Sequence, residues 1–203
     1  FKRRTDSGDF AGENKIQRHH LESHYAIETF DLKFIYSSGD SESHNSFDGD
    51  LYELSSTFSE SLRDIRNRNI ELFSNIYVGN TRWLFGTAYA GEEDHIDSEN
   101  NVLFGEDLFP ISSNESLAKI DNYAFFTSLD TDIKSINVNI DLRYAIDKIE
   151  YRVFDTIETY GNDNHWSSIS PRVNLSYQTP KQGVIYASIA KGNKPGGFNE
   201  NLE

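Results

Sequence analysis

The sequence predicts an all-β protein whose antiparallel strands form part of a transmembrane β-barrel. Apolar and polar residues alternate over several segments, short turns alternate with longer polar connections, and the chain contains 14 Phe and 11 Tyr. Successive side chains of a strand point to opposite faces of a sheet, so strict alternation indicates one apolar and one polar face. A barrel wall between lipid and water has these two faces, with aromatic girdles at its edges.

The clearest alternation runs from Ile136 to Ile146. Six apolar or aromatic residues occupy every second position, and the positions from Ser135 to Ala145 between them carry five polar side chains and one alanine. A tilted strand that crosses a bilayer needs about 9–11 residues, whereas strands of soluble sheets usually have about 5–6. This segment is therefore expected to cross a membrane. The pattern continues less strictly through Tyr151 and Val153, so the strand is expected to project beyond it.

Four hairpins with short turns near residues 29, 79, 132 and 180 are expected. Each joins two segments with period-two alternation, which is typical of half-buried strands. Together with a partial strand at residues 1–5, this predicts eight full strands and one partial strand. The paired segments are residues 21–27 with 32–36, 70–78 with 82–91, 123–129 with 136–146, and 170–178 with 183–191.

Longer connections are expected between these hairpins, at residues 6–15, 39–64, 92–116 and 159–165. Residues 39–64 contain seven acidic residues and one Arg, and residues 92–115 contain eight acidic residues and no Lys or Arg. Loops of that length are uncommon in compact soluble domains, but they are ordinary on the extracellular side of a membrane barrel. A short helix over residues 52–66 is an alternative for part of the first connection.

Composition excludes several classes of protein. The net charge of −14 makes nucleic acid a poor partner, and the abundance of aromatic residues argues against disorder over the whole chain. No apolar run reaches the length of a transmembrane helix. The absence of Cys excludes disulfides and thiolate metal sites. The chain opens on Phe1 with no recognisable signal peptide, and we expect an internal piece of a longer protein.

The segment from Ser170 to Asn199 carries the most specific motif. It reads SPRV at residues 170–173, YAS at residues 186–188 and KGNKPGGFN at residues 191–199. This order resembles the mid-barrel signature of TonB-dependent outer-membrane receptors, in which an SPR strand, a short turn and a YAS strand precede a KPGGFN element. Similar strands of that family are matched, in the same order, by IELFSN at 70–75, WLFGTAY at 83–89 and DLRYAIDK at 141–148.

The resemblance covers about residues 16–199 and implies a barrel of about 22 strands with a plugged lumen. Neither the plug domain, the TonB-contacting box nor the C-terminal aromatic strand is recognisable. Residues 1–203 are therefore expected to be an internal part of the barrel domain. The resemblance further implies TonB-energised uptake of a scarce solute across a bacterial outer membrane, with several membrane-spanning strands. A ferric siderophore is the first expectation, and cobalamin, haem and oligosaccharides are the other options.

The partners implied are TonB, acting through the plug, the lipid of the outer membrane, and a small-molecule substrate. The resemblance implies a transporter, and the sequence contains no motif of an enzyme active site. Alternation predicts the side chains that face the lumen, and two further residues are expected near the outer rim. The lumen-facing candidates are Asn137, Asn139, Asp141, Arg143, Arg172, Asn174 and Ser176, and the rim candidates are His95 and Trp166.

No cofactor or metal site is expected. His20 and His24 stand four residues apart, which is a helical spacing that the surrounding period-two pattern contradicts. The acidic connections contain no calcium-binding loop motif. The glycine-rich exit after Lys191 lacks the order of a phosphate-binding loop.

Two other classes remain as alternatives. One is a soluble antiparallel adhesin or carbohydrate-binding module, in which the apolar face of residues 136–146 packs on a second sheet. The other is a small passive outer-membrane pore, in which the first and last strands pair with each other.

Overall fold

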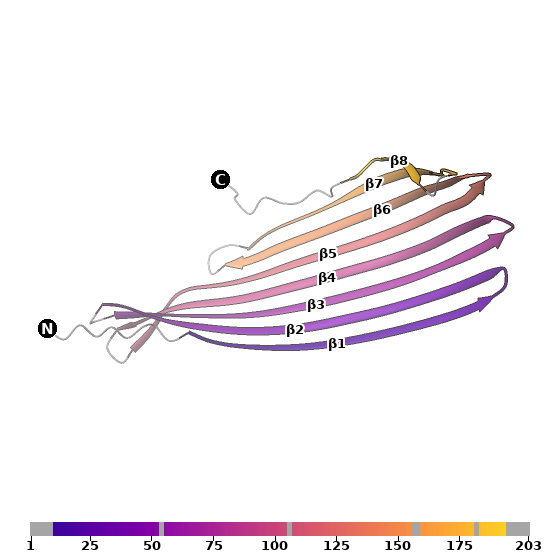
Figure 1. Ribbon diagram of the computed structural model, residues 1–203. Helices are drawn as coiled ribbons and strands as arrows, with labels where there is room; N and C mark the ends of the chain where they lie inside the picture. Colours follow the sequence, from indigo (N-terminus) through magenta and orange to yellow (C-terminus); the bar gives the residue numbers. More distant parts are fainter. Residues whose placement is uncertain (1–9, 53–54, 105–106, 156–158, 181–182, 194–203) are drawn as a thin grey trace.

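In the computed structural model the protein forms one curved antiparallel sheet of eight strands in chain order (Figure 1). The structure describes residues 10–52, 55–104, 107–155, 159–180 and 183–193. These residues confirm the predicted all-β antiparallel fold with eight full strands, whereas the expected partial strand at residues 1–5 lies outside them. The strands are β1 (Phe10–Ile27), β2 (Phe30–Tyr52), β3 (Ser55–Val78), β4 (Thr81–Phe104), β5 (Asp107–Ile133), β6 (Ile136–Asp155), β7 (Thr159–Gln178) and β8 (Val184–Ala190).

Tight turns join the strands at one end of the sheet (Figure 1). The first three turns have two residues each, at residues 28–29, 79–80 and 134–135. Gly79 and Lys134 adopt positive φ angles of 58° and 59°, which suit the twist of a two-residue hairpin. The third turn was expected near residue 132, but pairing continues until Ile133 faces Ile136.

The fourth turn is closed by local hydrogen bonds. The backbone N–H of Thr179 donates to the carbonyl of Gly183 at 2.8 Å, and the N–H of Gly183 donates to Oγ1 of Thr179 at 3.0 Å. The turn therefore lies where the sequence predicted it, near Pro180. Residues 194–199 of the KPGGFN motif lie outside the described residues.

The prediction of long loops between the hairpins is wrong for most of their length. Strands β2 to β5 contain 23, 24, 24 and 27 residues, and they take in most of residues 39–64 and 92–116. Of the loop expected at residues 6–15, the described residues 10–15 belong to β1, and the loop expected at residues 159–165 belongs to β7. The helix considered for residues 52–66 is also wrong, because β3 begins at Ser55.

The strand extensions carry mainly polar side chains, so a search for alternating apolar and polar residues does not find them. A strand shows a period-two hydropathy pattern only where one face contacts an apolar phase, while backbone pairing requires no apolar residue. Polar cross-strand contacts accompany the pairing instead. Ser59 Oγ, for example, donates to Asn100 Oδ1 at 2.8 Å between β3 and β4.

The strand register gathers the apolar residues on one face. Ile140 of β6 pairs with Leu129 of β5 and with Val173 of β7, so the alternating residues of all three strands lie on the same side. This apolar face forms a band next to the tight turns, and its side chains are exposed, as Phe125 is to 59% and Ile189 to 74%. The band includes Leu21, Tyr25, Leu32, Ile70, Leu72, Ile76, Trp83, Phe85, Tyr123, Phe125, Ile140, Leu142, Ile169, Leu175, Ile185 and Ile189.

The described residues form this single sheet and no second layer. The soluble alternative required a second sheet against residues 136–146, and the small-pore alternative required pairing between β1 and β8. Neither contact occurs in the described part of the chain. No helix within these ranges has the length and hydropathy that a membrane crossing requires.

On the opposite, polar face, Gly86 leaves room for the aromatic ring of Phe126. Gly86 pairs with Phe73 of β3 and with Phe126 of β5. A Cβ atom added to Gly86 would lie 2.3 Å from Cζ of Phe126 and 2.8 Å from Cβ of Phe73. The Phe126 ring therefore occupies the space that any other residue would fill with its side chain.

We predict that Gly86→Ala lowers the free energy of unfolding by about 1–3 kcal/mol, because overpacking forces side chains and backbone to shift. Urea unfolding in detergent micelles measures this. Gly39→Ala is the matched control within a strand, since its added Cβ has no neighbour closer than 3.8 Å. Equal unfolding midpoints for both variants would contradict the prediction.

Candidate functional site

The polar face carries all seven residues predicted to face the lumen. The register of β6 and β7 pairs Asn137 with Ser176, Asn139 with Asn174, and Asp141 with Arg172. Six of the seven candidates thus form three adjacent cross-strand pairs. Arg143, the seventh, pairs with Ser170 on the same face.

A chain of side-chain hydrogen bonds crosses four strands of this face. Ser188 Oγ of β8 donates to Asn174 Oδ1 at 2.6 Å, and Asn174 Nδ2 donates to Asn139 Oδ1 at 2.7 Å. Asn139 Nδ2 donates to Ser128 Oγ of β5 at 3.1 Å. Each amide is a donor on one side and an acceptor on the other, so the chain orients all of its members.

Charged side chains lie in the cross-strand rows next to this chain of hydrogen bonds. Arg172 Nε donates to Asp141 Oδ2 at 2.7 Å, with side-chain exposures of 56% and 22%. Arg82 Nη2 donates to Asp130 Oδ2 at 3.1 Å, and Asn137 Nδ2 donates to Asp130 Oδ1 at 2.8 Å. Partly exposed ion pairs of this kind contribute about 0–1 kcal/mol. Their main effect is to fix the positions of charged groups on a solvent-exposed surface.

A second polar cluster lies farther from the tight turns. Two of its members, Asn122 and Asp147, were not predicted from the sequence. Arg143 Nη2 donates to Asn122 Oδ1 at 3.2 Å, and Asn122 Nδ2 donates to the buried carboxylate of Asp147. Trp166, predicted at the outer rim, pairs across β6 and β7 with Asp147. Continuing the alternation from Arg143 by four residues would have identified Asp147.

His95, the other rim candidate, lies on the opposite side of the sheet from Trp166. An even number of positions separates His95 from Phe85 of the same strand, so His95 lies on the extension of the apolar face. There His95 Nε2 is 2.8 Å from Glu115 Oε1. The two rim candidates therefore do not converge on one site.

The extended strands carry a two-point ion pair on the polar side. Arg63 Nε donates to Asp94 Oδ1 at 2.8 Å and Arg63 Nη2 donates to Asp94 Oδ2 at 2.6 Å. These bonds raise the pKa of the Arg63 guanidinium further above its ordinary value. This two-point geometry is characteristic of Arg–carboxylate recognition. Sequence reasoning missed the pair because it treated both segments as loops.

Within the described ranges no three His, Asp or Glu side chains come together in a way that would hold a metal ion. The site is therefore a polar surface of amides and ion pairs that runs along β4 to β8, backed by an apolar band on the reverse side.

The comparisons with known proteins agree with this geometry. The family profile described as "TonB dependent receptor-like, beta-barrel" matches residues 2–203. The chain belongs to the TonB-dependent receptors. Members of this family are transporters of the bacterial outer membrane and not enzymes, and the sheet is a part of the receptor barrel. No curated protein sequence matches the chain.

Solved structures show the same fold at low sequence identity. The ferric yersiniabactin uptake receptor FyuA from Yersinia pestis superposes with a TM-score of 0.71 at 10% identity, over 87% of this chain and 28% of that protein. The siderophore receptor PiuA from Acinetobacter baumannii gives 0.61 at 12% identity, over 89% and 32%. The copper transporter OprC gives 0.55 at 10% identity, over 88% and 36%. The chain thus spans about a third of the length of these proteins.

We predict that water-soluble thiol reagents label cysteines introduced at Asn137, Asn139 and Asp141, whereas lipid-soluble reagents label cysteines at Ile136, Val138 and Ile140. Alternate positions face opposite sides of the sheet, and residues 1–203 contain no cysteine of their own to interfere. Labelling of the receptor in membranes measures this. A reversed pattern would contradict the assignment of the polar face to the lumen.

Proposed function

We propose that this chain supplies wall and extracellular strand extensions to the barrel of a receptor that takes up a ferric siderophore across the bacterial outer membrane, energised by TonB. The observation that carries the proposal is the continuous polar face opposite an apolar band, in a member of the TonB-dependent receptor family. We further propose that the chain is an internal part of a barrel of about 22 strands, and that the plug lies elsewhere in the full protein.

The two faces of the sheet support this role. The apolar face of β6 runs from Ile136 to Ile146, which matches the 9–11 residues that a tilted strand needs to cross a bilayer. With that face toward lipid, several strands of the chain span the membrane, and the network around Asn139 and Asn174 faces the lumen. Amides and balanced ion pairs offer hydrogen bonds to water and polar solutes without a strong field of one sign.

The length of the strands supports an extracellular role for the rest of the chain. Strand β5 has 27 residues, and a bilayer crossing uses about 9–11 of them. The remainder stands outside the membrane as a paired, polar extension of the wall. The Arg63–Asp94 pair lies in this extension, where it holds β3 and β4 together at the mouth of the barrel.

Two of the structural neighbours support a substrate class. FyuA is named for uptake of ferric yersiniabactin and PiuA as a siderophore receptor, which supports a ferric siderophore as the cargo. In the proposed mechanism the substrate binds the extracellular loops and the plug, and TonB acts on the plug to open a path along the polar face.

We predict that a bacterium lacking its own siderophore receptors takes up radiolabelled ferric siderophore when it produces the full-length receptor. Uptake should fall to the level of the receptor-free strain when TonB is deleted, because the barrel alone supplies no energy. A panel of ferric siderophores, haem and cobalamin identifies the cargo. Uptake that persists without TonB would indicate a passive pore and contradict the proposal.

A further inference from the structure

We propose that the lumen side of the strand extensions selects an iron complex with an apolar surface and no net negative charge, such as a neutral ferric trihydroxamate. The lumen side continues the polar face of the sheet, and the lipid side continues the apolar face. The inference rests on the proposed function and deepens it, because it names the chemistry of the cargo.

The two sides of β6 exchange their polarity beyond the apolar band. Within the band the lipid side of this strand is apolar and the lumen side is polar. Past the band the lipid side carries Lys148 and Glu150, whereas the lumen side carries Ile149, Tyr151 and Val153. Side chains alternate between the two sides of a strand, so the apolar residues now lie on the opposite side of the wall.

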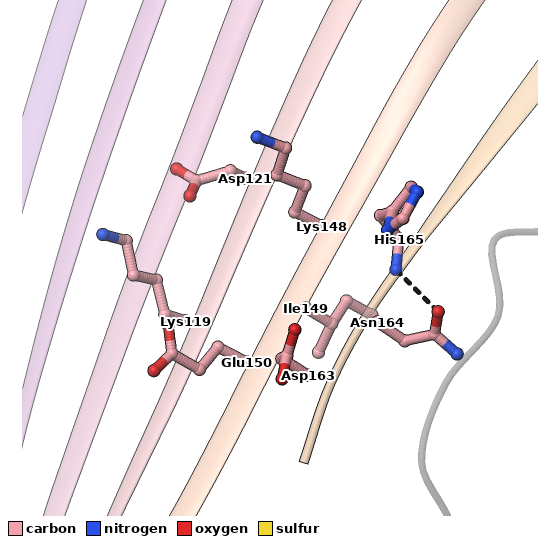
Figure 2. A pocket seen from close by; sticks show the side chains of 8 residues that line it. All are labelled: Lys119, Asp121, Lys148, Ile149, Glu150, Asp163, Asn164 and His165. Atoms are coloured by element: carbon pink, nitrogen blue, oxygen red, sulfur yellow. Dashed lines mark hydrogen bonds between the residues drawn. The ribbon is translucent and has the colours of Figure 1, made fainter.

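Strand β5 makes the same exchange at the same level. On its lipid side Tyr123 is followed by Asp121 and Lys119, and on its lumen side Asn122 is followed by Ile120. Figure 2 shows the ionic residues of the lipid side, which line a cavity of about 300 Å³ together with residues of β7: Lys119, Asp121, Lys148, Glu150 and Asp163. The exchange of polarity is therefore a property of neighbouring strands and not of a single residue.

The apolar residues of the lumen side form one continuous surface, here called the inner patch. It consists of Ile120 on β5, Ile149, Tyr151 and Val153 on β6, and Tyr160 on β7. Ile149 pairs with Ile120, and Val153 pairs with Tyr160. The side chains of Ile120 and Tyr160 are 39% and 48% exposed. A contiguous exposed apolar surface marks a site of interaction.

The cargo is the occupant that the position of the inner patch favours. In the proposed orientation the lipid contacts the other side of the sheet, and the inner patch lines the extracellular mouth through which the substrate enters. The patch extends over three cross-strand rows, which corresponds to about 14 Å along the strands. This length is sufficient for contact with a small molecule.

Neutral amides border the inner patch on β7. Asn162 and Asn164 pair with Tyr151 and Ile149 of β6. Amides donate and accept hydrogen bonds without carrying a net charge. Ligand sites usually combine an apolar and aromatic lining with a few polar groups that fix the orientation of the ligand. The inner patch thus fits a solute with apolar surface and neutral polar groups.

The charged side chains next to the inner patch are acidic. Glu92 of β4 pairs directly with Ile120, and the next residue on the lumen side of β4 is Asp94. The buried carboxylate of Asp147 lies one step from Ile149 on β6. These groups repel an anionic complex, and the apolar side chains between them make its desolvation costly.

Two arginines of the same side are already engaged. Arg63 donates to both carboxylate oxygens of Asp94, at 2.8 Å and 2.6 Å, and Arg143 Nη2 donates to Asn122 Oδ1 at 3.2 Å. They therefore compensate only part of the negative charge beside the inner patch. A neutral complex meets no such repulsion, so the surface selects against ferric triscatecholates and ferric polycarboxylates.

The test measures binding of three iron complexes to the full-length receptor in detergent micelles by isothermal titration calorimetry. The probes are a neutral ferric trihydroxamate, a trianionic ferric triscatecholate and ferric citrate. We expect the neutral complex to bind at least about tenfold more tightly than either anionic complex. Equal or tighter binding of an anionic complex would overturn the inference.

The double variant Ile120→Asn/Ile149→Asn tests the apolar contact. It should weaken binding of the neutral complex about tenfold or more, because apolar surface at the contact is lost. Leu117→Asn is the matched control on the lipid side of β5 and should leave the affinity unchanged. A lower unfolding midpoint of the double variant with unchanged affinity would show that a segment of the receptor covers the patch, and would overturn the inference.

Glu92→Lys tests the charge independently of the apolar contact. Glu92 is exposed, and its replacement by a cation should strengthen binding of the triscatecholate about tenfold while the affinity for the neutral complex stays the same. Glu93→Lys places the same change of charge on the lipid side of β4 and is the matched control. Equal effects of the two variants would contradict a role of the lumen side.

Uptake of radiolabelled iron separates this inference from the proposed function. TonB-dependent uptake of an anionic complex, without uptake of the neutral one, would overturn the inference and leave the proposed function standing. A receptor that imports none of the iron complexes would disprove the proposed function, and the inference with it.

Discussion

The structure depends on a strand register that keeps the apolar residues of β1 to β8 on the same face of the sheet. A slip of one residue between two strands would move every apolar side chain of one of them to the wrong face. The register shifts occur near Asp50 and Asn100, far from the apolar band, where no apolar face has to be kept on one side of the sheet. Through the apolar band the pairing is continuous, so eight separate alternating segments become one two-faced wall.

The described part of the sheet has few buried side chains, and its apolar residues face an apolar phase outside the protein instead of a hydrophobic core. Few described side chains are buried, and large apolar ones such as Phe125 are exposed on one face. In water that face would drive aggregation, whereas in a bilayer it contacts lipid. The edge of the band is therefore the most demanding region of the surface. At Tyr89, Gly91 and Asp121, aromatic, small and charged residues are combined so that an aromatic row is followed directly by a polar row.

The two faces of the sheet differ in the side chains that they present. The hydrogen-bonded chain through Asn139 and Asn174 presents fixed donors and acceptors on the polar face, and the reverse side presents the apolar band. The strand extensions continue the pairing beyond the apolar band, and Arg63 and Asp94 form a two-point ion pair between β3 and β4 there.

The sequence by itself determined the strand class, the four tight turns and the face of each predicted lumen residue, because alternation and turn chemistry are local. It also carried the family resemblance through the motifs at residues 170–199. Only the tertiary structure decided that the acidic stretches are strands, because pairing there depends on neighbouring strands and leaves no hydropathy pattern. It also decided that His95 and Trp166 lie on opposite faces, and that Asp147 joins Asn122, because such relations depend on register between segments far apart in the chain.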